Sequence, residues 1–144
     1  MSKESTHIVC FSDGGARGNP GPAGAGAIIF GADGTTIARV SQFLGNATNN
    51  FAEYAGVLLA LKTAKKHFGT KTKMYSFEVK IDSELVARQL AHRYQIKEPS
   101  LVPQFIEIHN LRVKDFPHLT FTHVPRAQNK EADALANEAM DRKG

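Results

Sequence analysis

The order in which strand-like and helix-like segments follow one another leaves few folds open to this chain of 144 residues. The first three segments are short apolar or alternating runs joined by turn residues, as is typical of strands: HIVCF (7–11), AGAGAIIF (23–30) and TIARVSQFL (36–44). A compact hairpin connection, GADG (31–34), joins the second segment to the third. We therefore predict three antiparallel strands that are neighbours in one sheet.

Helical periodicity begins only after these strands. Apolar residues recur at helical spacing through NNFAEYAGVLLALKTAKKHF (49–68), and Gly69 supplies a stop signal. A strand, SFEVKID (76–82), follows, and then a helix, SELVARQLAHRY (83–94), with Ser83 as its cap. Strands and helices therefore alternate in the second half of the chain.

The last part of the chain repeats this alternation. A helix is expected over 100–116, because its Pro103 falls in the first turn, where proline is tolerated. LTFTHV (119–124) is the last strand, and Asn129 is expected to cap a final helix. The order βββαβααβα predicts an α/β fold: a five-stranded mixed sheet, with three antiparallel strands and then two parallel ones, flanked by helices.

Four acidic residues each lie shortly after one of the predicted strands. Asp13 follows the first strand and Asp82 ends the fourth, whereas Glu53 and Asp133 lie in the first turns of the helices after the third and fifth strands. Because the first, third, fourth and fifth strands are expected to run in the same direction, these positions meet at one edge of the sheet. Open α/β sheets bind their ligands at that edge.

Carboxylates gathered in this way predict a metal site. Like charges in a partly desolvated place repel one another unless they are protonated or neutralised by cations. Oxygen ligands without cysteine favour Mg²⁺ or Mn²⁺ over zinc. Two such ions about 4 Å apart activate water and stabilise the leaving oxygen in phosphodiester cleavage.

Each acidic residue also has a structural explanation. Glu53 stands three residues after Asn50, as in a reciprocal capping arrangement, and Asp133 can complement the positive end of a helix dipole. Asp13 and Asp82 stand where turn-forming residues are common. Turn and cap residues need not all fall at one sheet edge, however, so their joint placement favours a site.

The glycine-rich segment around Asp13 does not match a nucleotide-binding loop. Such loops place a helix directly after glycines spaced as GxGxxG or GxxxxGK[ST], whereas here a strand, AGAGAIIF, follows. The small residues instead allow a bound molecule to approach the backbone beside Asp13.

Composition narrows the class of protein further. The length is that of one ordinary domain, so we expect a single domain over residues 1–144. Cys10, the only cysteine, leaves no internal disulfide and is expected to pack in an apolar run. No run resembles a signal peptide or a membrane span, so a cytoplasmic protein without membrane association is expected. The net charge of +4 permits a polyanionic partner.

Four segments resemble the type 1 ribonucleases H, in the family's order and over nearly the whole chain: SDGGARGNPGPAGAGAI (12–28), TNNFAEYAGVLLAL (48–61), IDSELVARQL (81–90) and NKEADALANEAM (129–140). The resemblance implies the ribonuclease H-like fold. It also implies hydrolysis of the RNA strand of RNA–DNA hybrids with two Mg²⁺ ions, for which Mn²⁺ can substitute, to give 5′-phosphate and 3′-hydroxyl ends. The implied metal ligands and catalytic carboxylates are Asp13, Glu53, Asp82 and Asp133.

The resemblance also assigns substrate contacts to residues around these carboxylates. Small and amide side chains there suit close approach and hydrogen bonding to 2′-hydroxyls and base edges. The implied contacts to the RNA strand are Gly14, Gly15 and Asn19, those to the minor groove are Asn49 and Asn50, that to a DNA-strand phosphate is Thr48, and Ser83 completes the substrate-binding set.

Three features depart from the family's pattern. The segment HRYQIKEPSLVPQF (92–105) is short, without the basic, Trp-containing protrusion of many members, so either hybrid binding is weaker or other basic residues carry it. Glu84 replaces the amide that commonly follows the Asp-Ser pair. The family's mobile catalytic His has two candidate equivalents here: His123, ten residues before Asp133, and Arg126, which we favour because it lies on the loop.

Two other functions remain open on the sequence alone. The first is a non-catalytic domain that binds hybrids, and the second is another two-metal nuclease of the same fold. The sequence implies no protein partner, and we expect a monomer.

Overall fold

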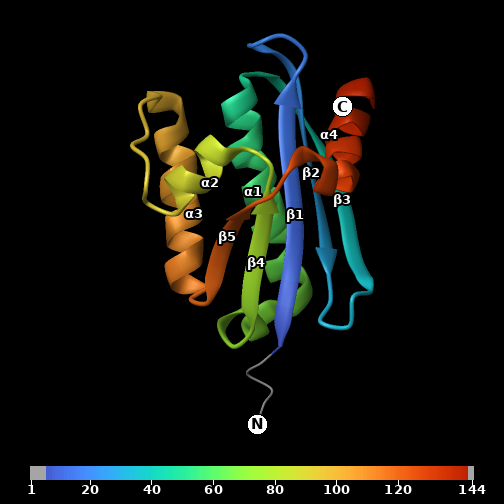
Figure 1. Ribbon diagram of the computed structural model, residues 1–144, viewed down its shortest axis with the longest axis vertical. Helices are drawn as coiled ribbons and strands as arrows, with labels where there is room; N and C mark the ends of the chain where they lie inside the picture. Colours follow the sequence, from blue (N-terminus) through green and yellow to red (C-terminus); the bar gives the residue numbers. More distant parts are fainter. Residues whose placement is uncertain (1–5, 143–144) are drawn as a thin grey trace.

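The computed structural model describes residues 6–142; the ends of the predicted domain, 1–5 and 143–144, lie outside the described residues. Helices flank a five-stranded sheet with the strand order β3-β2-β1-β4-β5 (Figure 1). The strands are β1 His7–Ala16, β2 Gly21–Phe30, β3 Thr36–Ala47, β4 Ser76–Ile81 and β5 Leu119–His123. The helices are α1 Asn49–Phe68, α2 Glu84–Leu90, α3 Val102–Lys114 and α4 Lys130–Arg142.

The pairing of the strands confirms the predicted mixed sheet. β1 pairs antiparallel with β2, and β2 with β3, whereas β4 pairs parallel with β1, and β5 with β4. In the parallel register Ser12 lies opposite Ile81. The next residues along the two strands are Asp13 and Asp82, so the register sets these two aspartates side by side at the end of β4.

Apolar side chains from the sheet and α1 form the core. The predicted face of α1 is buried, including Tyr54 and Leu61, and packs with strand residues such as Phe77. Cys10 is fully buried with a free thiol, as expected from its apolar surroundings. Along the part of the chain that is described, no helix is both long and apolar enough to cross a membrane.

Helix α1 lies in backbone contact with β1. A Cβ atom added to Gly56 of α1 would lie 2.5 Å from the carbonyl oxygen of Asp13. In the opposite direction, a Cβ atom on Gly14 would overlap the carbonyl group of Ala52. Real side chains do not approach so closely, so glycine on both sides allows the helix to lie against the strand. Because Glu53 is the residue after Ala52, this contact places Glu53 beside the C-terminal half of β1.

Helix α4 makes the equivalent contact with β2, on the opposite face of the sheet. A Cβ atom on Gly26 would lie 2.6 Å from the carbonyl oxygen of Ala132, and one on Gly24 would lie 2.6 Å from that of Ala136. Gly26 is the antiparallel partner of Asp13. Asp133 is the residue after Ala132, so the contact brings Asp133 close to Gly26 and therefore close to Asp13 on the neighbouring strand.

The helix predicted over 83–94 is shorter than expected. Ser83 caps α2 as predicted, since its hydroxyl accepts a hydrogen bond from the Val86 N–H at 3.3 Å, but the helix ends at Leu90. His92 has a φ of 64°, and the N–H of Arg93 bonds the carbonyl of Arg88 at 2.8 Å. This is a Schellman ending, in which one left-handed residue turns the chain away. Such an ending normally uses glycine, so the sequence offered no signal for it.

Substitution of two neighbouring glycines tests the contact between α1 and β1. Gly14→Ala is expected to lower the free energy of unfolding by about 1–3 kcal/mol or more, because its methyl group overlaps the α1 backbone. Gly15→Ala is the matched control, because the nearest heavy atoms to its Cβ lie 3.9 Å away. Its stability should change by less than about 1 kcal/mol. Urea unfolding followed by circular dichroism measures both, and equal stabilities would contradict the contact.

Candidate active site

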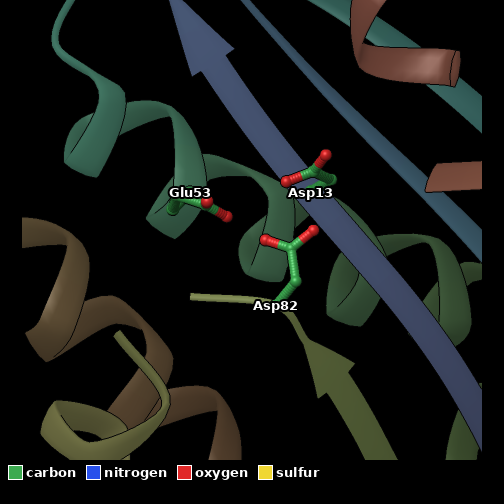
Figure 2. Close-up of side chains that lie close together, drawn as sticks. All are labelled: Asp13, Glu53 and Asp82. Atoms are coloured by element: carbon green, nitrogen blue, oxygen red, sulfur yellow. The ribbon is translucent and has the colours of Figure 1, made fainter. Parts of the chain in front are cut away.

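Three carboxylates converge beside the C-terminal half of β1, where β4 ends (Figure 2). One oxygen from each of Asp13, Glu53 and Asp82 lies within 4.8 Å of the other two. Asp13 lies within β1, which runs on to Ala16 instead of ending before Asp13 as predicted. Glu53 comes from α1, and Asp82 directly follows β4. The predicted meeting of these residues at one edge of the sheet is confirmed.

The capping explanation for Glu53 is wrong. Thr48 caps α1, because its hydroxyl accepts a hydrogen bond from the Phe51 N–H at 3.2 Å. The helix thus begins at Asn49, and Glu53 lies in its second turn rather than its first. One carboxylate oxygen of Glu53 is buried without a hydrogen-bond partner among the described residues. A buried, unpaired carboxylate oxygen is costly for a protein and is suited to a cation.

The electrostatics of Asp13 and Glu53 support the same conclusion. The pKa of Asp13 is raised, and burial is the largest cause. The charge of Asp82 comes next, and Asp133 adds to the effect through a hydrogen bond and through its charge. Burial, followed by the charges of Asp13 and Asp82, raises the pKa of Glu53, while the charge of Arg126 acts in the opposite direction. Without a cation these two groups favour the protonated form, whereas a bound cation would favour the carboxylates.

Asp133 and Arg126 face the same open space. They line a pocket of about 440 Å³ together with Asp13 and Glu53. Asp133 lies outside the set of three mutually close carboxylates, but it is near enough to affect the pKa of Asp13 through a hydrogen bond. The predicted fourth acidic residue is therefore at the site, on the α4 side of Asp13.

Asn129 does not cap α4 in the predicted manner. Its side-chain Nδ2 donates hydrogen bonds to the carbonyl oxygen of Ser12 at 2.9 Å and to Oδ2 of Asp82 at 3.1 Å. The side-chain oxygen, which a cap would use, has no hydrogen-bond partner among residues 6–142. Cap residues and site residues share the same amino-acid types, so the sequence did not distinguish the two uses.

Known proteins share this sequence and geometry. A family model described as reverse transcriptase-like matches residues 11–139. LC11-RNase H1, isolated from compost by a metagenomic approach, is 43% identical with a TM-score of 0.90, and its crystal structure in complex with an RNA/DNA hybrid aligns with 94% of this chain and 98% of its own. Ribonuclease HI of Halobacterium salinarum is 40% identical over 134 residues, 93% of this chain and 64% of its own. The chain belongs to the type 1 ribonuclease H family.

Some members of this family are much longer than the chain. The bifunctional protein Rv2228c of Mycobacterium tuberculosis is 42% identical over 135 residues, which is 93% of this chain. The same region is 35% of that relative, so the chain spans about a third of its length. Membership of the ribonuclease H family and the ribonuclease H-like fold are both confirmed by these comparisons.

The donor set fits the divalent cations that such a family would use. The three mutually close groups that could ligate a metal are all carboxylates, which suit hard cations such as Mg²⁺. One buried oxygen of Glu53 has no hydrogen-bond partner among the described residues, and burial raises the pKa of Asp13, so a bound cation would stabilise the ionised form of both groups. We conclude that Asp13, Glu53 and Asp82 can hold a divalent metal ion.

The predicted substrate contacts lie around the pocket and also hold it together. Asn49 Oδ1 accepts a hydrogen bond from the Ala16 N–H at 2.8 Å, and Asn19 Oδ1 accepts one from the Asn49 N–H at 2.9 Å. These bonds join the turn between β1 and β2 to the start of α1. Gly14, Gly15 and Asn49 line the carboxylate pocket itself.

The other predicted contacts lie farther along the same surface. Thr48 lines a separate pocket of about 270 Å³ with Ser100. Asn50 Nδ2 donates to Oε1 of Glu98 at 2.7 Å, and Ser83 caps α2. Their contacts with substrate stay predictions.

The structure separates the two candidates for the mobile group. Arg126 lies in a 3₁₀ turn, Arg126–Gln128, is exposed, and lines the pocket. His123 is the last residue of β5, opposite Ile81 in the parallel pairing, and does not line that pocket.

Arg17 is a pocket residue that the sequence analysis did not single out. It lines the pocket from the turn between β1 and β2, and one guanidinium nitrogen lies 2.7 Å from Oδ1 of Asp141 and 3.3 Å from Oδ1 of Asn137. Its place in the glycine-rich segment was the available signal, because that segment was already expected to face a bound molecule.

The pH dependence of stability without metal tests the electrostatics. A carboxyl group whose pKa is raised on folding stabilises the protein below its unfolded pKa and loses that contribution as the pH rises through the folded value. The wild-type protein in EDTA should therefore lose stability between pH 4 and about 8, the raised pKa of Asp13. Asp13→Asn should be the more stable protein at pH 8 by at least about 1 kcal/mol, the equivalent of a pKa shift of roughly one unit.

Asp33→Asn is the control for this measurement. Hydrogen bonds from the side chain and backbone of Thr35 lower the pKa of Asp33, so its contribution is present above its unfolded pKa and is lost as the pH falls. The control should therefore lose stability relative to wild type at pH 8. Urea unfolding at pH 5 and pH 8 measures all three proteins. An Asp13→Asn variant with no advantage at pH 8 would contradict the raised pKa.

Proposed function

We propose that this chain is an endoribonuclease that hydrolyses the RNA strand of RNA–DNA hybrids by a two-metal-ion mechanism. The convergence of Asp13, Glu53 and Asp82, with Asp133 beside them, is the observation that carries the proposal. A family member, LC11-RNase H1, has been crystallised in complex with an RNA/DNA hybrid. Residues 1–144 form the single domain of this proposal, which acts as a cytoplasmic monomer without a protein partner.

The four carboxylates hold the metal ions in this proposal. Asp13, Glu53 and Asp82 would hold one Mg²⁺ ion, and Asp13 and Asp133 would hold a second; Mn²⁺ could substitute. When bound, such ions lower the pKa of the attacking water and stabilise the departing 3′ oxygen. The chain itself orients these carboxylates and partly shields them from water. This shielding strengthens their electrostatic attraction to cations. The products carry 5′-phosphate and 3′-hydroxyl ends.

Residues around the pocket bind the hybrid. Gly14, Gly15 and Asn19 contact the RNA strand, and Asn49 and Asn50 reach the minor groove. Contacts to 2′-hydroxyls distinguish RNA from DNA without reading the sequence. Thr48 holds a phosphate of the DNA strand, and Ser83 lies beside Asp82 within reach of the substrate.

The segment between α2 and α3 takes the place of the missing basic protrusion. It contributes Arg93, Tyr94 and Lys97 to a pocket of about 470 Å³ next to α2. The guanidinium of Arg88, which is also paired with Glu84, lies 5.6 Å from the centre of the Tyr94 ring, so one basic group lies against the aromatic ring. Basic groups neutralise phosphates and aromatic rings stack on sugars or bases, which is why we assign hybrid binding to this segment.

A substrate panel tests the activity. RNA–DNA hybrid, duplex RNA, duplex DNA and single strands are incubated with Mg²⁺, Mn²⁺ or EDTA, and we expect cleavage of the hybrid alone, in its RNA strand and with metal. Asp13→Asn should lower this cleavage at least about a thousandfold, because metal-held charge is worth several kcal/mol in the transition state. Undiminished cleavage by the variant would contradict the assignment. Tight hybrid binding without turnover would identify a binding domain, and cleavage of another substrate would identify a different nuclease.

The two candidates for the mobile group are separated by a matched pair of variants. Arg126→Ala should lower kcat by about 10-fold or more, because a cationic group at the pocket assists charge or product handling. His123→Ala should retain kcat within about 3-fold, because its side chain does not line the pocket. Steady-state kinetics on a labelled hybrid measures both. A larger loss in His123→Ala than in Arg126→Ala would reverse the assignment.

A further inference from the structure

The side chain of Asn129 links the backbone of β1 to the Asp82 carboxylate. It is 1% exposed and precedes α4. Its Nδ2 donates to the carbonyl oxygen of Ser12, the residue before Asp13, and to Oδ2 of Asp82. One amide nitrogen thus connects the backbone of β1 to a carboxylate beyond the end of β4.

The orientation of this amide follows from its neighbours. Both groups that it contacts are acceptors, and only the NH₂ end of an asparagine side chain can donate to them. The oxygen end makes no hydrogen bond within the described part of the chain. Asn129 is therefore a buried amide held by its donor end, and the loss of that end would leave the Ser12 carbonyl without this donor and Asp82 without its fixed partner.

We infer that Asn129 is a positioning residue for the metal site, an inference that rests on the proposed function. Its hydrogen bond restrains the Asp82 carboxylate in the rotamer that faces Asp13 and Glu53, while lone pairs remain for a cation. The same amide holds the β1 backbone at Ser12, directly before Asp13, so it fixes the spacing between Asp13 and Asp82. A carboxylate at this position could not do so, because it would face a carbonyl and another carboxylate with no donor.

If Asn129 positions Asp82, its removal should weaken metal binding. Groups that orient metal ligands typically change metal affinity by about 10- to 100-fold when they are removed. Asn129 lies outside the set of predicted substrate contacts, so its removal should leave the KM for the hybrid near the wild-type value at saturating metal. The loss of kcat at low Mg²⁺ should be restored by raising the Mg²⁺ concentration.

The test is a Mn²⁺ titration of the full chain without nucleic acid, followed by the EPR signal of free Mn²⁺. Asn129→Ala is expected to bind Mn²⁺ about 10- to 100-fold more weakly than the wild type. Gln104→Ala is the matched control: Gln104 is also a buried amide, its Nε2 donates to the Phe51 carbonyl at 3.1 Å, and its oxygen is likewise unpaired. The control should lose thermal stability and keep its affinity for Mn²⁺.

A folded Asn129→Ala protein with wild-type Mn²⁺ affinity would overturn the inference, since a purely structural amide affects stability alone. If that variant does not fold, NMR of the unsubstituted protein decides. The side-chain NH₂ signals of Asn129 should shift during a Mg²⁺ titration with the same midpoint as the backbone amide of Asp82, and unchanged signals at saturation would overturn the inference. Mn²⁺ binding that depends on Asn129 in a protein unable to cut hybrids would contradict the proposed function only.

Discussion

The close contact of two helices with the β1–β2 ribbon is the constraint on which the site depends. Glycine removes the side chains at the points of contact, where Gly56 of α1 lies against the backbone of Asp13 and Gly26 of β2 lies against Ala132 of α4. Each helix carries an acidic residue next to its contact with the sheet. Glu53 follows Ala52, which lies against Gly14 on one face of the sheet, and Asp133 follows Ala132 on the other face. Larger residues at these points would push both helices outward and separate the carboxylates, so the packing and the chemistry share one requirement.

The cost of this arrangement is electrostatic. The register of β1 and β4 sets Asp13 beside Asp82, and α1 adds the partly buried Glu53 to the same space. Burial and mutual repulsion raise the pKa of Asp13 and of Glu53, and the opposing charge of Arg126 is only a minor influence on Glu53. A fold selected for stability alone would replace at least one of these groups. Their retention in one place is best explained by a cation, which converts the repulsion into binding energy.

Much of this could be predicted from the sequence because the fold is determined by periodicity and connection rules. Strand order and parallel register follow from the sequence of elements, and they sufficed to bring Asp13, Glu53 and Asp82 to one edge. Three helix ends were predicted wrongly, because several residues nearby could have formed the cap or the ending. Hydrophobic periodicity does not show which of them does so. A left-handed His92 ended α2 early, Thr48 capped α1 in place of Asn50, and Asn129 used its amide for Asp82 rather than for its own helix.

The hydrogen bonds around the pocket also limit what the protein can recognise. The side-chain oxygens of Asn19 and Asn49 are both used within the protein, where they accept backbone N–H groups. Among residues 6–142 the NH₂ end of each amide has no hydrogen-bond acceptor, so that end can donate to a ligand. In the proposed function these donors meet acceptors, and every base pair presents acceptors in the minor groove, as do the 2′-hydroxyl oxygens of RNA. A site that offers donors to acceptors common to all sequences can require RNA in one strand and still ignore the order of its bases.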